Sequence, residues 1–413
     1  MFSALRHRNF QLFVFGQFIS LIGFWLQNVG QSWLVYRLTH SATYLGAIAF
    51  SQQIPILLLA VPAGGFVDRT NRHRMVMITQ MLLLVQATVL SLLTFADKIT
   101  IGGLFVLAAL MGIISAFDLP ARQAFLVQMV GKKDLMNAIA INSSMFNGAR
   151  MIGPAIAGIV VAKWGESYCF LLNAVTYVAV IVSLLLMTIR PVETESPQSW
   201  AKDLTDGFRF VRETAPVRVM LQLVGAFGIS GFSFAVLLPV FADRIFNRGA
   251  TGLGWLMTAV GIGALLGALF LASRRGLKGI SKLIAISAFG FALCLMLFSL
   301  SLYFWLSFGL LCLLGFFMLT MIASINTAIQ SIIPDSFRGR VMSFFTTMLI
   351  GMGPIGSLIA GALADSVGTQ IAVFVFALFC LAAAFWFYRS LPSIQAEGRR
   401  LYLLQNPQFG DPL

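Results

Sequence analysis

The sequence predicts an all-α membrane protein of twelve transmembrane helices, arranged as two pseudo-symmetric bundles of six. Of its 413 residues, 59% are hydrophobic and only 10% are charged, whereas soluble proteins carry roughly 25% charged residues. The apolar residues fall in runs of about 20, the length that lets a helix cross about 30 Å of hydrocarbon. These runs lack the alternation of apolar and polar residues that is typical of membrane β-barrels. Lipid is therefore the expected solvent.

Charged or turn-rich breaks divide the apolar runs into two sets of six. The first set lies in residues 1–190 and predicts an N-terminal bundle, and the second lies in 219–389 and predicts a C-terminal bundle. The polar stretch 191–218 contains three prolines and predicts a cytoplasmic linker. Residues 390–413 are polar and predict a cytoplasmic tail. The expected spans are residues 10–36, 44–67, 75–95, 101–117, 137–161, 168–189, 219–241, 252–271, 283–300, 304–327, 341–364 and 371–387.

Lysine and arginine are distributed unequally across this topology. If the N-terminus is inside, 22 of the 28 basic residues face the cytoplasm, five lie in outside loops, and Arg150 alone lies within a span. This split satisfies the positive-inside rule. We therefore expect a multi-pass protein of the bacterial inner membrane with both termini in the cytoplasm. The topology also explains the net charge of +13, so we expect no nucleic-acid partner.

A loop after the second span carries five residues with a distinctive spacing: Gly64, Asp68, Arg69, Arg72 and Arg74. They match a signature of the major facilitator superfamily, which this chain resembles. The resemblance implies the major facilitator fold and a latch that holds the two halves together on the cytoplasmic side. A carboxylate suits this role because it accepts charge-assisted hydrogen bonds from basic groups or from a helix N-terminus. A basic loop that only sets the topology is the alternative.

The fifth span carries a second signature that resembles the antiporters of the same superfamily. Its residues are Ala149, Gly153, Pro154, Ala157 and Gly158, with alanine at two positions where the signature has glycine. Small residues at four-residue spacing allow close helix packing, and a proline inside a helix removes a backbone hydrogen bond and bends it. The resemblance implies export. A structural kink with no part in transport is the alternative.

Further motifs resemble the drug and siderophore exporter branch of the superfamily, among them Arg8-Asn9-Phe10 and residues 117–122. The resemblance implies a secondary active transporter that exports amphipathic small molecules by alternating access, driven by protons. One position departs from the branch, because Ala108 stands where its proton-coupled members often carry arginine. A translocator of lipid or lysophospholipid from the same superfamily is the alternative, followed by a membrane scaffold that does not transport.

Carboxylates avoid the centres of the expected spans. Asp118 and Asp243 come nearest to entering a span, so they are the candidates for protonation during transport. An ion pair between Asp118 and Arg122 that braces the helix end is the competing interpretation of Asp118.

Polar residues within the spans predict the wall of a substrate cavity. A polar stripe in a bilayer should face a cavity or a partner instead of lipid, and residues three, four, seven or eleven apart share a helix face. A buried polar network that only holds the helices together, with no substrate contact, is the alternative. The expected lining residues are Gln17, Phe24, Asn28 and Gln31 on the first span, Ser143, Asn147 and Arg150 on the fifth, and Gln222, Ser324 and Asn326 in the second half.

The sequence does not predict an enzyme, a cofactor or a metal site. The three histidines are scattered, no nucleophile and base share a motif, and the four cysteines lack C-x-x-C spacing. We expect a monomer whose partners are a small amphipathic substrate and the lipid bilayer.

Overall fold

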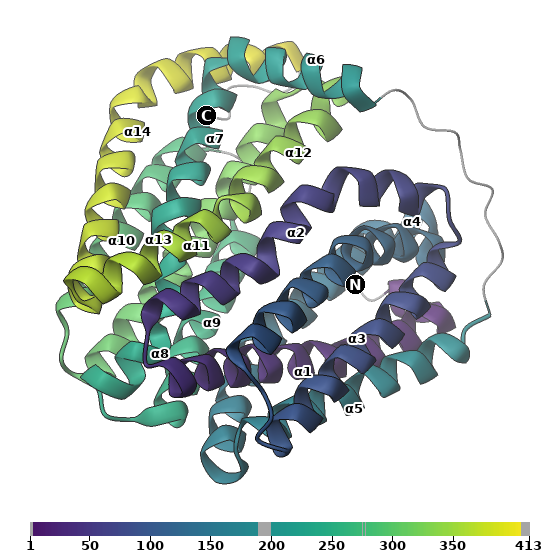
Figure 1. The fold of residues 1–413 in the computed structure, drawn as a ribbon. Helices are drawn as coiled ribbons and strands as arrows, with labels where there is room; N and C mark the ends of the chain where they lie inside the picture. Colours follow the sequence, from purple (N-terminus) through teal and green to yellow (C-terminus); the bar gives the residue numbers. More distant parts are fainter. Residues whose placement is uncertain (1–2, 189–199, 275, 277, 406–413) are drawn as a thin grey trace. The chain divides into compact units, whose positions relative to one another are not determined.

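The structure is a computed structural model that describes residues 3–188, 200–274, 276 and 278–405. These residues form helices joined by short turns (Figure 1). Twelve helical segments among them are long and apolar enough to cross a membrane, which confirms the expected number of spans. Residues 189–199, in the expected linker, and 406–413, in the expected tail, lie outside this part of the chain.

The helices of the first half correspond to six spans, because α4 contains two. Its backbone is helical throughout except at Gly131, where φ is +70°. The bounds are η1 Ser3–Arg6, α1 Arg8–Thr39, α2 Ala42–Asp68, α3 Arg72–Phe95, α4 Ile101–Trp164 and α5 Glu166–Leu185.

The second half begins with a short helix and a span that is not one regular α-helix. The bounds are α6 Trp200–Glu213, α7 Ala215–Ala226, η2 Phe227–Gly231, η3 Phe232–Leu237, α8 Leu238–Val240, η4 Phe241–Ile245, α9 Gly249–Ser273, α10 Ile280–Leu300, α11 Phe304–Ile332, α12 Asp335–Gly351, α13 Gly353–Val367 and α14 Thr369–Gln405.

The chain folds as two compact units. Unit 1 comprises Met1–Pro197 and Leu238–Thr258, and unit 2 comprises Gln198–Leu237 and Ala259–Leu413. Unit 1 therefore includes residues 238–258, which the sequence analysis assigned to the C-terminal bundle. These residues pack with the first half through small side chains and hydrogen bonds that are described below.

Unit 1 is held together by an apolar core and by a buried group of amides. In the core, Phe10 and Phe125 are fully buried. The amides come from three helices: Asn173 of α5 donates to Gln27 of α1 at 2.6 Å, and Gln27 donates to Gln86 of α3 at 3.1 Å. Hydrogen bonds between side chains of different helices stabilise helix association inside a membrane. The amide group therefore fixes α1 against α3 and α5.

The fourth span extends beyond its expected end at residue 117. The helix continues to Gly131, so Asp118 and Arg122 lie within it, not in a loop. The expected boundary was wrong because hydropathy falls at the first charged residues, whereas the helix ends only where the backbone leaves the helical region. Arg150 is therefore not the one basic residue inside a span.

Helical structure also extends into the expected linker and tail. Helix α6 packs within unit 2, where Phe210 stacks on Phe337 with 4.6 Å between ring centroids and Asp206 lies 3.8 Å from Arg340. Helix α14 continues to Gln405, past the expected end of its span at residue 387, and curves along its length in Figure 1.

Candidate functional site

A cavity of about 390 Å³ opens within unit 1, and helices α1 to α5 supply its wall. The wall mixes aromatic and aliphatic side chains with hydroxyl and amide groups, and Arg122 and Tyr177 are its ionisable members. The lining residues are Phe13, Gln17, Ser20, Leu21, Phe24, Asn28, Gln52, Gln53, Ile56, Leu83, Met111, Ser115, Leu119, Arg122, Gln123, Leu126, Asn142, Phe146 and Tyr177.

The structure places three of the expected lining residues of α1 on this cavity: Gln17, Phe24 and Asn28. Gln17 is only 3% exposed, and its Oε1 accepts no hydrogen bond from the described residues. A buried polar atom without a partner is uncommon in native structures. Gln17 is therefore available to a polar group of a ligand. Asn28 donates to the carbonyl oxygen of Phe24 at 2.9 Å.

The other expected residues of unit 1 lie elsewhere. Gln31 is buried and does not line the cavity. On the fifth span the lining residues are Asn142 and Phe146 instead of Ser143, Asn147 and Arg150. Asn147 donates to its own helix, at the carbonyl of Ser143. Arg150 is partly exposed, and within the described part of the chain no hydrogen bond or ion pair engages it.

The remaining expected cavity residues belong to unit 2. Gln222 is exposed on α7. Ser324 is buried on α11, and its hydroxyl finds no partner among the described residues. Asn326, on the same helix, accepts a hydrogen bond from Gln330 one turn later.

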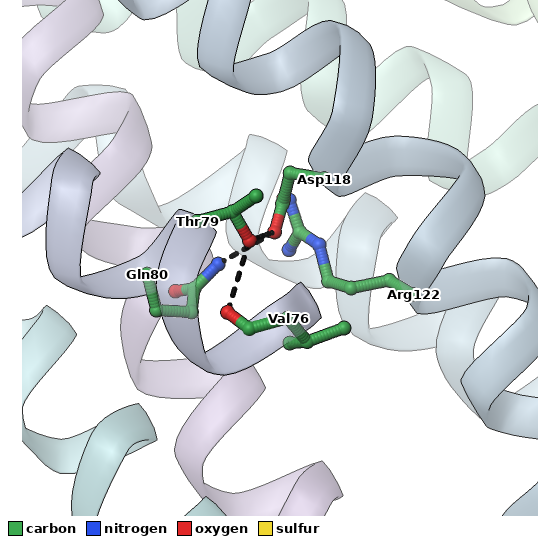
Figure 2. Close-up of polar contacts among 5 residues, drawn as sticks. All are labelled: Val76, Thr79, Gln80, Asp118 and Arg122. Atoms are coloured by element: carbon green, nitrogen blue, oxygen red, sulfur yellow. Dashed lines mark hydrogen bonds and ion pairs between the residues drawn. The ribbon is translucent and has the colours of Figure 1, made fainter. Parts of the chain in front are cut away.

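Asp118 lies fully buried beside the cavity, at the centre of a polar cluster (Figure 2). Its Oδ2 forms an ion pair with Arg122, one turn later on α4. Its Oδ1 accepts hydrogen bonds from the hydroxyl of Thr79 at 2.7 Å and from the side-chain amide of Gln80 at 2.9 Å. The ion pair that the sequence analysis offered as one interpretation of Asp118 is therefore present.

The hydroxyl of Thr79 has two acceptors but only one proton. Besides Asp118 Oδ1, the carbonyl oxygen of Val76 lies 2.9 Å from it (Figure 2). A hydroxyl donates one hydrogen bond and accepts others. When Asp118 is ionised, Thr79 can donate to it. When Asp118 is protonated, Thr79 can accept from it and donate to Val76. The cluster thus satisfies either protonation state.

Arg122 was not expected as a lining residue, although residues 117–122 carry a recognised motif. Its pairing with Asp118, four residues earlier, was expected. The expected end of the span at residue 117 placed Arg122 outside the helix, so a position on the cavity wall was not expected. Other missed lining residues are amides in otherwise apolar spans, and these were detectable: Gln52, Gln53 and Asn142.

Asp243, the second candidate for protonation, lies in a different part of unit 1. The hydroxyl of Tyr36 donates to Asp243 Oδ2 at 3.2 Å. The neighbouring Arg244 donates to the backbone carbonyl of His40 at 2.7 Å and stands over the Tyr36 ring. These contacts join the end of α1 to η4. Asp243 does not line the cavity.

The expected latch is described in part, because the side chain of Asp68 lies outside the described side chains. Arg69 follows the end of α2, and Arg72 begins α3. A side chain added at Gly64 would meet no described atom within 4 Å. Asn71, which replaces a glycine of the signature, caps α3 by accepting from the backbone N–H of Arg74 at 3.0 Å. This cap gives asparagine a local role there.

The small residues of the fifth span form a packing face. Ala149 and Ala157 are fully buried. Trp25 of α1 covers Gly153, and a Cβ added at Gly158 would lie 2.9 Å from the carbonyl oxygen of Ala250 and 3.0 Å from Cα of Gly254. Pro154 stands in the same tight contact, since its carbonyl oxygen approaches Gly254. The motif therefore brings α4 close to the start of α9.

The chain is similar to known proteins along most of its length. Residues 1–408 match a family described as "Transmembrane secretion effector", a major facilitator family. The staphyloferrin A transporter of Staphylococcus aureus is 30% identical, over 93% of this chain and 97% of the relative. The multidrug efflux pump Tap of Mycolicibacterium fortuitum is 30% identical, over 81% and 84%. The enterobactin exporter EntS of Escherichia coli is 24% identical, over 86% and 85%.

Solved structures support the fold. A bacterial homologue of the human lysosomal transporter Spinster superposes with a TM-score of 0.71 at 13% identity, over 95% of this chain and 98% of that one. The nucleoside transporter NupG gives a TM-score of 0.72 at 17% identity, over 94% and 99%. These similarities confirm the expected major facilitator fold. The relatives are transporters, which confirms the expectation of a transporter instead of an enzyme.

Proposed function

The chain belongs to the transmembrane secretion effector family of major facilitator transporters, and from this premise we propose that it exports amphipathic small molecules by alternating access, in exchange for protons. Relatives that are named as efflux pump and exporter support the direction. The position of the chain in a bacterial inner membrane, with both termini in the cytoplasm and with a monomer as the working unit, is part of the same proposal.

The observation that carries the proposal is the cavity in unit 1. Aromatic side chains such as Phe13, Phe24 and Phe146 offer flat apolar surface. Amides such as Gln17 and Asn28 offer orienting hydrogen bonds, and Gln17 has a free acceptor. A pocket of mixed apolar walls and a few polar groups suits ligands that are themselves amphipathic.

Proton exchange is proposed at Asp118. A proton carrier must exist in two charge states, and Thr79 can hydrogen-bond to both of them. Its neighbours that can carry charge are Arg122, on its own helix, and Tyr177, whose phenol of α5 lines the same cavity. The other groups that contact Asp118, Thr79 and Gln80 of α3, are neutral. Protonation would therefore change the local charge by one.

The proposed proton exchange at this pair would also restrict which substrates are exported. With Asp118 ionised, its charge offsets that of Arg122. With Asp118 protonated, Arg122 presents an uncompensated cation to the cavity. A monovalent cationic ligand about 6 Å away would then lose on the order of 3 kcal/mol at an effective dielectric constant of about 20. An anion would gain instead. Proton uptake therefore expels a cationic substrate but retains an anionic one, so antiport through Asp118 favours cationic amphipathic compounds.

Transport by purified protein in liposomes tests the proposal. Three labelled probes would be compared with and without an imposed pH gradient: ethidium as a cationic amphipath, enterobactin as a siderophore, and a lysophospholipid. When the pH gradient is imposed, we expect ethidium to accumulate by moving in the direction opposite to the protons. This accumulation should stop when the gradient is dissipated. Movement of the lysophospholipid alone would instead support a lipid translocator. The absence of transport of all three probes, gradient or not, would contradict the proposed export.

A further inference from the structure

A second hollow, of about 600 Å³, lies within unit 2 between α10 and α14. It is a groove beside the N-terminal part of α10, the helix that begins at Ile280. Two cationic side chains line it together with apolar and aromatic ones, and none of its lining residues is acidic. The lining residues are Lys282, Ala285, Ile286 and Phe289 of α10 and Tyr388, Arg389, Leu391, Pro392 and Gln395 of α14.

One wall of the groove belongs to a face of α10 that is exposed along the length of the helix. Ile286 is 61% exposed, Leu293 53% and Leu300 61%. Intervals of seven residues place these side chains on one face of a helix. An exposed apolar row on a membrane-spanning helix faces hydrocarbon. The groove is therefore open to the lipid side of the helix.

The aromatic residues of α14 indicate the depth of the groove in the membrane. Trp386 and Tyr388 are exposed, and exposed tryptophan and tyrosine gather at the boundary between hydrocarbon and water. Tyr388 packs edge-on against Phe289, with 6.1 Å between ring centroids. The groove thus lies at the level where phospholipid head groups lie.

The charges of the groove come from different helices, and that of Arg389 is held in place. The guanidinium of Arg389 stacks over the ring of Phe385, 4.6 Å from its centroid, a cation–π contact that restricts its position. Lys282 stands in the first turn of α10. The positive-inside rule alone explains basic residues at the end of a span. It does not explain why both of these residues line the same hollow.

We propose that this groove binds one anionic phospholipid. Its phosphodiester lies between Lys282 and Arg389, since charge-assisted hydrogen bonds from ammonium and guanidinium groups are the usual means of holding phosphate. Its acyl chains follow the apolar row of Ile286 and Leu293. Basic pockets between transmembrane helices are a known form of acidic-lipid site. The bound lipid joins α10 to α14 and is separate from the cavity of unit 1.

Native mass spectrometry and thermal unfolding of the purified full chain test this proposal. Phosphatidylglycerol and phosphatidylcholine with the same acyl chains would be added to the detergent-solubilised protein. We expect phosphatidylglycerol to remain bound at one copy and to raise the unfolding temperature more than phosphatidylcholine does. Glycerol 3-phosphate, which carries the phosphate without the chains, should give no such shift.

Two double variants with the same loss of charge locate the site. Lys282→Gln with Arg389→Gln should abolish the preference for phosphatidylglycerol. Lys278→Gln with Arg400→Gln changes exposed basic residues outside the groove and should retain it. Lys282→Arg with Arg389→Lys keeps both charges and should also retain it, which separates lipid binding from a folding defect. The proposal fails if the groove variant keeps the preference, if both glutamine variants lose it equally, or if glycerol 3-phosphate is as effective as the lipid. Transport need not occur for any of these outcomes, so they are independent of the proposed export.

Discussion

At the scale of single residues, Asp118 is unusual because a buried carboxylate is provided with partners for both of its charge states. An unpaired buried charge is strongly unfavourable, and Arg122 compensates the ionised form. The protonated form needs an acceptor, and Thr79 can provide one because its own proton can turn to Val76. Asp243 has a different environment: its carboxylate accepts a hydrogen bond from Tyr36, and it does not line the cavity.

Replacing Asp118 by asparagine should uncouple transport from protons. Asparagine keeps the size of the side chain and can still accept from Thr79 and Gln80, but it does not titrate. We expect ethidium to move down its own gradient through Asp118→Asn with no response to a pH gradient in liposomes, and more slowly than through the unaltered protein because Arg122 is left uncompensated. Asp243→Asn is the matched control and should keep the response. If Asp243→Asn lost the response and Asp118→Asn kept it, the assignment of the proton site would be reversed.

Thr79 should matter through its hydroxyl and not through its shape. In Thr79→Val the buried carboxylate loses a donor, which should cost about 1 to 3 kcal/mol of stability and slow proton-driven transport. Thr79→Ser keeps the hydroxyl and should remain close to the unaltered protein in transport. Unfolding temperature and the initial rate of ethidium transport would be measured for both. Equal transport rates in the valine and serine variants would argue against the hydroxyl switch.

At the scale of helices, the existence of each span was easier to predict than its ends or the face that it turns to the cavity. The sequence predicted all twelve spans, because apolar length is a strong signal. The fourth span was expected to end at residue 117, because the charged residues that follow suggested a loop. The helix in fact continues to Gly131, where the backbone leaves the helical region. The lining residues of the fifth span are Asn142 and Phe146, neighbours of the expected Ser143 and Asn147. Rotation depends on tertiary packing, which a single helix sequence does not specify.

The close contact between α4 and the start of α9 gives a test at the same scale. A Cβ at Gly158 would meet backbone atoms of Ala250 and Gly254, which cannot move aside as a side chain can. Gly158→Ala should therefore destabilise the protein by about 1 to 3 kcal/mol, the usual cost of overpacking. Gly102→Ala is the control, because no described atom lies within 4 Å of its added Cβ. A lower unfolding temperature for the control than for Gly158→Ala would contradict the packing argument.

At the scale of the whole molecule, the sequence predicted the fold class from composition, run length and charge distribution. It did not predict that residues 238–258 would pack with the first half. Those contacts depend on glycines and single hydrogen bonds between distant segments, such as Gly158 with Gly254 and Tyr36 with Asp243. Such pairings leave no periodic pattern in the sequence. The latch role of Asp68 stays a prediction.

The orientation in the membrane is a testable consequence of the charge distribution. With 22 basic residues expected on one side and five on the other, the linker should be cytoplasmic. A cysteine introduced as Ser196→Cys, in a background without the four native cysteines, should react with a membrane-impermeant maleimide only in inside-out vesicles. Labelling in intact spheroplasts, with none in inside-out vesicles, would overturn the topology.

Proton movement during substrate transport, in the absence of an imposed pH gradient, tests the central claim most directly. Liposomes that contain the protein and a trapped pH indicator would be given an inward gradient of ethidium. The proposed exchange at Asp118 predicts that the interior becomes alkaline as ethidium enters, since protons leave as the cation arrives. It also predicts that Asp118→Asn abolishes this signal while ethidium still enters at a reduced rate. An interior that acidifies with ethidium entry, or an unchanged signal in Asp118→Asn, would contradict the account.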